Sequence, residues 1–156
     1  MTSWEVTMYS KILVPLDGSP RAEAILPHVA ALAQTCGAEV VLAQVIEPQP
    51  KVTTPGELMP ALPVAVINEL TAAAEAYLSC IKDSLGRQGL RVRTLVPYGP
   101  VVEQIIAVAE QEKVDLIAIA SHGRGGLAQL FYGSVASALL QRADQPLLMV
   151  RSRDGR

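Results

Sequence analysis

The sequence predicts an α/β protein, an open, doubly wound, five-stranded parallel sheet with helices on both faces, which is a Rossmann-like fold. Half of the residues are hydrophobic and only 4% are aromatic, so the core consists mainly of Ala, Val, Leu and Ile, as in sheets covered by helices. Short apolar runs alternate with longer segments whose apolar residues recur every three or four positions. That alternation is typical of parallel strands joined by right-handed crossovers.

The first strand and helix are the clearest pair in the sequence. Lys11 to Leu16 is a short apolar run, followed by a turn with a helix cap at Asp17 to Ser19. Apolar residues then recur at helical spacing from Ala22 to Cys36. Gly37 ends that pattern, as a glycine after the last helical residue commonly does.

The second strand is expected at Val40 to Glu47, where a nearly continuous apolar run predicts a central strand buried on both faces. The segment from Pro48 to Pro63 contains five prolines and has no periodicity, so it is expected to be the one long loop. A long helix follows over Val64 to Leu85 and is ended by Gly86 and Gly89. Its predicted inner face consists of Ile67, Leu70, Ala74, Tyr77, Leu78, Ile81 and Leu85.

The third strand, Arg91 to Val96, alternates charged and apolar residues, which predicts a sheet edge. Pro100 opens the next helix, which has an apolar face and a polar end at Glu110 to Lys113. The fourth strand is Val114 to Ser121, again almost without polar residues. These elements continue the alternation.

The last helix is expected at Ser134 to Arg142, and Pro146 precedes a final strand, Leu147 to Arg151. This strand is short and apolar, which favours a place at a sheet edge with free backbone groups. Covering the edge is one explanation of its composition. Pairing with a second copy of the chain, as a homodimer, is the other, and we favour the dimer.

Length and charge restrict the class of protein. A chain of 156 residues fits one domain, here 1–156 with tails at 1–10 and 152–156. The net charge of −2 and the absence of a Lys/Arg run argue against a nucleic-acid partner. Uninterrupted apolar stretches fall short of the roughly 18 residues of a membrane span, and the start lacks the pattern of a signal peptide. A cytoplasmic protein without a membrane association is expected.

Two loops follow strands at the edge where doubly wound sheets bind their ligands. One is PLDGS from Pro15 to Ser19, and the other begins ASHGRGG at Ala120. The second has three glycines within four residues and leads into a helix, so backbone N–H groups and the helix dipole can hold a phosphate. Ser134, at the predicted N-cap, and Arg124 can add hydrogen bonds. The alternative is that these glycines form only a flexible turn.

Two known phosphate motifs do not describe this loop. The pattern GxxxxGK[ST] is absent, which excludes a Walker-type P-loop. The segment GRGGLA from Gly123 to Ala128 matches GxGxxG/A, but that motif opens its helix directly. Because the helix begins only near Ser134, we reject a dinucleotide site.

The sequence resembles the universal stress protein family. The resemblance rests on KILVPLDGS, on SHGRGG with GS ten residues beyond its first glycine, and on QPLLMVR, and it covers Lys11 to Arg151. It implies the adenine nucleotide alpha hydrolase-like form of the fold and ATP as ligand, alone or with Mg²⁺. The ATP-binding members have a glycine, two residues, a glycine, nine residues, a glycine and then Ser or Thr. This chain matches except at the first glycine, which is Ala120.

The resemblance also implies site residues. Asp17 is assigned to the ribose hydroxyls, while Pro15 and Val45 line the adenine slot. The phosphate group of residues consists of Gly123, Arg124, Gly133, Ser134 and Val135, with Ala120 at the first motif position and Ser121 and His122 alongside. It further implies a homodimer joined through the C-terminal strand, and binding with slow or no turnover.

Other roles compete for three of these residues. Asp17 can cap the following turn, with or without a sugar-binding role. Val45 fits a core position equally well. No carboxylate adjoins His122 in the sequence, so phosphate contact or loop packing is favoured over catalysis, and we assign neither catalytic residues nor metal ligands.

The predicted function is an ATP-binding regulatory stress protein. Ala120 motivates the alternative, a dimeric interaction protein of the same family that holds no nucleotide, and an ATPase is a weaker third.

Overall fold

The computed structural model describes residues 8–48, 62–122 and 133–152. Five strands form one sheet in the order β3-β2-β1-β4-β5, and all four strand pairs are parallel. The strands are β1 (Lys11–Pro15), β2 (Glu39–Ala43), β3 (Val92–Leu95), β4 (Leu116–His122) and β5 (Leu147–Ser152). The predicted fold class is confirmed, and the third and last strands lie at the two edges, as their sequences predict.

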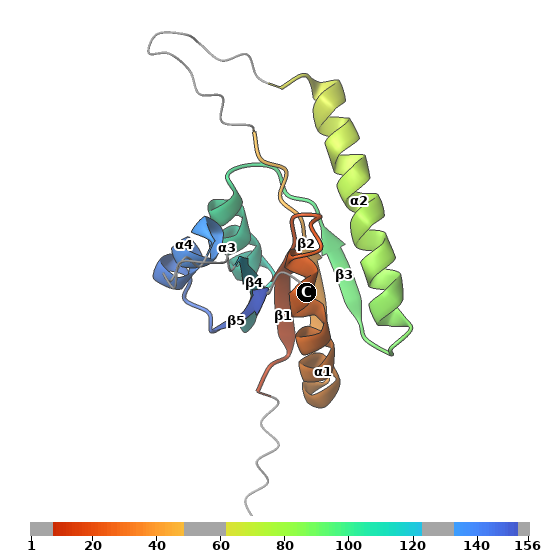
Figure 1. Ribbon diagram of the computed structural model, residues 1–156, viewed down its shortest axis with the longest axis vertical. Coiled ribbons are helices and arrows are strands. Elements are labelled where there is room, and N and C mark those ends of the chain that lie inside the picture. The colour runs from red at the N-terminus through yellow and green to blue at the C-terminus, as the bar shows by residue number, and fades with distance from the viewer. Residues whose placement is uncertain (1–7, 49–61, 123–132, 153–156) are drawn as a thin grey trace, which may run out of the picture.

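Helices cover both faces of the sheet (Figure 1). The 3₁₀ turn η1 (Ala22–Ile25), α1 (Leu26–Cys36) and α2 (Val64–Gly86) pack on one face, and α3 (Val101–Gln111) and α4 (Ser134–Arg142) pack on the other. Successive residues of a strand point to opposite faces. Ile12 therefore belongs to the core beneath α1 and α2, while Leu13 belongs to the core beneath α3 and α4. Because β1 is buried on both sides, its sequence is a continuous apolar run.

The direction of winding reverses between β1 and β4. From β1 the chain winds through β2 to the β3 edge, then crosses to β4, which pairs with the other side of β1. Crossovers leave in opposite directions from these two neighbouring strands, so their carboxyl ends border a crevice. This is the edge of the sheet where the sequence predicts the ligand.

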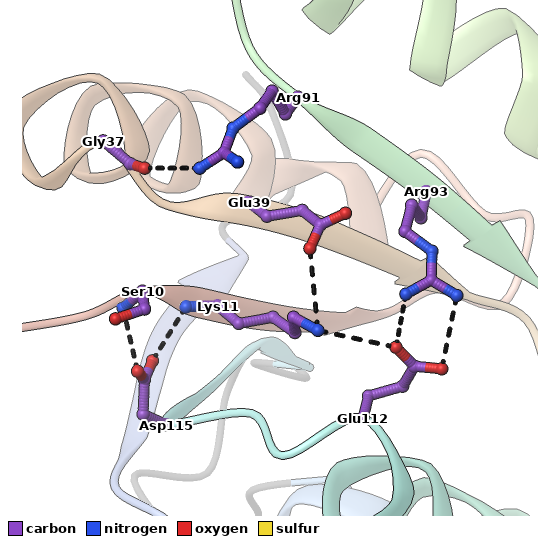
Figure 2. A network of polar contacts seen from close by, with 8 residues as sticks. All are labelled: Ser10, Lys11, Gly37, Glu39, Arg91, Arg93, Glu112 and Asp115. Atoms are coloured by element: carbon purple, nitrogen blue, oxygen red, sulfur yellow. Dashed lines mark hydrogen bonds and ion pairs between the residues drawn. The ribbon is translucent and has the colours of Figure 1, made fainter.

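Polar contacts join the elements at the other end of the strands, the amino end (Figure 2). Lys11 Nζ lies 3.6 Å from Glu39 Oε2 and 3.7 Å from Glu112 Oε2. Arg93 also reaches Glu112, with Nη1 2.6 Å from Oε2 and Nη2 3.4 Å from Oε1. The Asp115 carboxylate accepts the backbone N–H groups of residues 10 and 11 at 2.8 and 3.1 Å. Charged pairs thus tie β1, β2, β3 and the end of α3 together far from the crevice.

The first predicted helix is two elements. A 3₁₀ turn over Ala22–Ile25 precedes α1, which begins at Leu26 with Pro27 in its first turn. Proline has no N–H for an intrahelical bond, and it is tolerated where a helix starts. The predicted end is confirmed, because Gly37 is left-handed with φ of 66°.

The second strand is shorter than predicted and ends at Ala43 instead of Glu47. Its regular pairing stops there, since β1 ends at Pro15 and β3 ends at Leu95, although Ile46 still forms an isolated parallel bridge with Tyr98. Pro97 supplies only its carbonyl, to the N–H of Ile46 at 2.8 Å, because proline has no N–H with which to continue a ladder. Val45, predicted inside this central strand, therefore lies just beyond it.

The long helix α2 extends past the sheet. Its 23 residues span about 35 Å, whereas the strands beside it are only four or five residues long. Leu70, predicted on the inner face, is 40% exposed, and the buried contacts come from Ala74, Leu78, Ile81 and Leu85. Gly86, predicted to end the helix, is its last residue.

By length and composition α2 is also the one helix of the described residues that could cross a membrane. In the structure it instead covers one face of the sheet, and it carries Glu69, Glu75, Lys82 and Asp83 along its length. Most of the predicted long loop, 49–61, and the centre of the predicted glycine loop, 123–132, lie outside the described residues.

Candidate functional site

A cleft of about 360 Å³ opens at the carboxyl ends of the strands, beside the point where the winding reverses. Its walls come from β1 and the turn after it, from the segment after β2, from β4, and from the starts of α3 and α4. The volume lies in the ordinary range for small-molecule sites. Seven of the predicted site residues line it: Pro15, Asp17, Val45, Ala120, Gly133, Ser134 and Val135.

The remaining four predicted residues have different places. Ser121 is 5% exposed and is not among the residues that line the cleft. His122 is the last residue of β4, and its side chain lies outside what the structure describes, as do Gly123 and Arg124 altogether. Their predicted contacts with phosphate remain predictions.

The cleft is mainly apolar, with a few polar groups at its mouth. Its apolar wall includes Pro15, Val45, Ile105 and Ile119, and polar side chains come from Asp17, Gln44, Glu47 and Ser134. Sites of this composition bind ligands that combine a flat apolar part with a few hydrogen-bonding groups. A base joined to a sugar and phosphates has that composition.

The turn after β1 is organised by Asp17. Its Oδ1 atom accepts hydrogen bonds from the backbone N–H of Ser19 at 2.9 Å and from the Ser19 hydroxyl at 2.6 Å. The Ser19 Oγ atom in turn accepts the N–H of Ala22, the first residue of η1, at 3.2 Å. Gly18, with φ of 82°, allows the chain to turn between them. The capping role of Asp17 is thus present, and both of its bonds end on one carboxylate oxygen.

The start of α4 supplies another part of the wall of the cleft. Its N-cap is Gly133, in an extended conformation, so Ser134 is the first helical residue and not the N-cap that the sequence predicts. The extended backbone at Gly133 places the helix start one residue later than a serine cap would. The N–H groups of the first helical turn have no partners within the helix and carry the positive end of its dipole. Together they can hold an anion.

Ala120 is half-buried in β4 and pairs with Val150 of β5. It lines the cleft next to the start of α4, where the family pattern has its first glycine. The residue at this position is therefore part of the wall of the cleft.

The sequence analysis assigned no polar role near the site to two residues, Tyr77 and Gln44. Tyr77 of α2 donates its phenolic hydrogen to Glu23 Oε1 at 2.9 Å, which joins α2 to η1. Burial, the bond to Glu23 and the negative charges of Glu23 and Asp17 raise the pKa of the Tyr77 phenol well above its usual value. Gln44, directly after β2, lines the cleft. Only its position at the carboxyl end of a central strand could have indicated it.

Fold and cleft together define the class: open, doubly wound α/β proteins with a small-molecule crevice at the reversal of winding. Within this class the sequence matches the Universal stress protein family over residues 8–151, nearly the whole chain. The chain belongs to the universal stress protein family.

Known relatives agree with this assignment. The universal stress protein MJ0577 of Methanocaldococcus jannaschii is 31% identical, over 94% of this chain and 98% of its own length. The universal stress protein A homolog 1 of Coxiella burnetii is 33% identical, over 91% and 96%. A solved structure of the hypothetical protein MJ0577 has a TM-score of 0.78 and 32% identity, over 95% of this chain and 99% of that one.

A further solved universal stress protein is a complex with cAMP. It is 19% identical to this chain, with a TM-score of 0.66 and a coverage of 93% of this chain and 98% of that one. At this identity the likeness concerns the fold.

Proposed function

We propose that this protein binds ATP, alone or with Mg²⁺, in the cleft between β1 and β4 and acts as a regulatory stress protein. One observation carries the proposal: the cleft that contains the Asp17 turn also contains the start of α4. A carboxylate, a helix N-terminus and an apolar wall in one cleft match the sugar, the phosphates and the base of a nucleotide. The complex of a family member with cAMP supports an adenine nucleotide.

The lining residues suggest how the nucleotide lies. Its base occupies the slot between Pro15 and Val45, and its ribose hydroxyls bond to Asp17 Oδ2, for which no bond is recorded within the described residues. Its phosphates lie against the first turn of α4, at Gly133, Ser134 and Val135, with residues 120–124 completing the site. A Mg²⁺ ion would be held through the phosphate oxygens, in the way this ion is usually bound.

The proposal includes slow or no hydrolysis. Hydrolysis needs a base within hydrogen-bond reach of a water molecule beside the last phosphate. Of the two carboxylates that line the cleft, Asp17 is committed through Oδ1 to Ser19 and is assigned to the sugar, and Glu47 lies on the segment after β2 that carries Val45 of the base slot. ATP then acts as a signal that is bound and released, and the proposed location is the cytoplasm.

The test is calorimetric titration of the purified protein with MgATP, together with two matched variants. Asp17→Asn keeps Oδ1 as the acceptor for Ser19 but turns the second oxygen into a donor. It is expected to weaken ATP binding about tenfold or more, that is by about 1.4 kcal/mol. Asp144→Asn, exposed between α4 and β5, is the control and should bind as the wild type does. A wild-type protein that binds no ATP at millimolar concentration disposes of the proposal.

The second candidate function, a dimeric interaction protein without a nucleotide, is favoured by one observation. The Ala120 methyl group lines the cleft where the ATP-binding pattern has a glycine. If this methyl group excludes ATP, Ala120→Gly creates binding that the wild type lacks. If ATP binds the wild type, the same substitution changes its affinity less than threefold, and the first function is retained. In a protein that holds no nucleotide, Gly123→Val leaves function in the cell unchanged.

A further inference from the structure

Gln44 has a buried oxygen without a partner. Its Oε1 atom is the one buried side-chain N or O atom of the described residues for which no hydrogen-bond partner is found. The residue also lines the cleft. Buried acceptors are nearly always bonded in folded proteins, so each exception needs an explanation such as a ligand or a water molecule.

The backbone fixes where this amide stands. Gln44 N–H donates to the Leu95 carbonyl at 3.1 Å, and the N–H of Leu16 donates to the Ala43 carbonyl at 2.8 Å, so the segments after β1 and β2 stay side by side. A Cβ atom built on Gly18 would lie 3.6 Å from Gln44 Nε2. The amide group therefore lies beside the turn that carries Asp17.

The same geometry separates Gln44 from the base slot. Ala43 and Val45 pack with the core beneath α3 and α4, while Leu42 and Leu16 pack with the core beneath α1 and α2. Side chains alternate along an extended chain, and the contact with Gly18 agrees with a Gln44 side chain on the Leu42 side. Gln44 thus lies beside the turn that carries Asp17, and its side chain is on the opposite side of the chain from that of Val45.

We propose that Gln44 is a second sugar-recognising residue of the site: when its amide turns towards the cleft, its Oε1 accepts one ribose hydroxyl of the nucleotide while Asp17 Oδ2 accepts the other. This inference rests on the proposed binding of a nucleotide. Two acceptors on neighbouring strands suit the two adjacent hydroxyls of a ribose, each of which can donate one hydrogen bond. The arrangement selects ribonucleotides over deoxyribonucleotides, because a missing hydroxyl leaves one acceptor buried and unpaired.

The experiment measures Kd for ATP, 2′-deoxyATP and 3′-deoxyATP on the wild type, on Gln44→Met and on the control Gln141→Met, exposed near the end of α4. Methionine keeps the length of the side chain and removes the amide. Gln44→Met should weaken ATP about three- to tenfold, as loss of one hydrogen bond does. One of the two deoxynucleotides lacks the hydroxyl that Gln44 accepts. Its Kd should therefore be the same for the wild type and for Gln44→Met. The control should behave as the wild type throughout.

A second measurement separates recognition from structural support. Without a ligand, Gln44→Met removes an unsatisfied buried acceptor, so its melting temperature should equal that of the wild type or exceed it by roughly 2–4 °C. A lower melting temperature, or equal weakening of ATP and both deoxynucleotides, would show that Gln44 only packs and would overturn the inference.

Other results separate the inference from the function on which it rests. If the wild type binds ATP and Gln44→Met binds it equally well, Gln44 has no role in recognition and the proposed function stands. If Gln44→Met weakens the binding of ATP but not of ITP, which lacks the amine of adenine, Gln44 contacts the base and the sugar assignment is wrong. If the wild type binds none of these nucleotides, the proposed function fails and the inference fails with it.

Discussion

At the scale of single residues, Asp17 shows how one side chain serves the fold and leaves a group for a ligand. One oxygen holds Ser19, whose hydroxyl holds the first residue of η1. The sequence analysis allowed capping with or without sugar binding, and the structure shows the capping role, which uses Oδ1 alone. The resemblance to the family assigned Pro15 and Asp17 to the site, and both residues line the cleft. Gln44 could not be predicted, because its unpaired oxygen depends on which strands are neighbours.

Tyr77 gives a prediction about pH at this scale. Its phenol has a raised pKa, first because of burial and then because of Glu23 and Asp17. A raised folded-state pKa stabilises the protein fully below the unfolded value of about 10, and that stabilisation is lost as the pH rises towards the folded value. The difference in unfolding free energy between the wild type and Tyr77→Phe, measured by urea titration, should therefore shrink from pH 9 to pH 11. A difference that stays constant with pH contradicts this explanation.

At the scale of elements, the sequence located the five strands and the four α-helices of the described residues, but it merged η1 with α1 and placed the end of the second strand too late. The regular pairing of the second strand stops early because Pro97, beside its continuation, has no N–H for the ladder, and only an isolated bridge from Ile46 to Tyr98 follows. A pattern within one segment carries no information about its neighbours. The exposed start of α2 has the same cause, since the length of the sheet beneath a helix is not encoded in the helix.

Two glycines at helix ends provide a matched pair of substitutions. Gly37 is left-handed, and a Cβ there would meet no atom within 4 Å, so Gly37→Ala tests backbone conformation alone. It should lower the free energy of unfolding by about 1 kcal/mol. Gly86 ends α2 with equally open surroundings and without a positive φ, so Gly86→Ala should raise it by about 0.5 kcal/mol. Urea denaturation measures both, and changes of the same sign would contradict the assigned conformations.

At the scale of the whole molecule, the amino ends and the carboxyl ends of the strands have different roles. The amino ends of the strands are tied by Lys11, Glu39, Arg93, Glu112 and Asp115 (Figure 2), whereas the carboxyl ends border the cleft. The alternation of strands and helices predicted the fold class, and with it the edge that carries the cleft. Residues 123–132, the centre of the predicted glycine loop, lie outside the described residues, so the part of the site predicted there stays a prediction.

Assembly is a further prediction at this scale. The strand β5 lies at an edge, and its four apolar residues, 147–150, are only half-buried in the single chain. Such an edge can pair with a second copy, which would bury the exposed part of these side chains. Sedimentation equilibrium at micromolar concentration should give twice the mass of one chain. A single-chain mass at all concentrations would show that β5 is only a covered edge.

The central claim is that the cleft between β1 and β4 is a nucleotide site. The most direct measurement is the structure of a crystal soaked with MgATP. Electron density for the nucleotide is expected with its base between Pro15 and Val45, its ribose at Asp17 and its phosphates at the first turn of α4. A cleft that stays empty at millimolar ATP, or is filled by the chain's own side chains beside Asp17, would contradict the account.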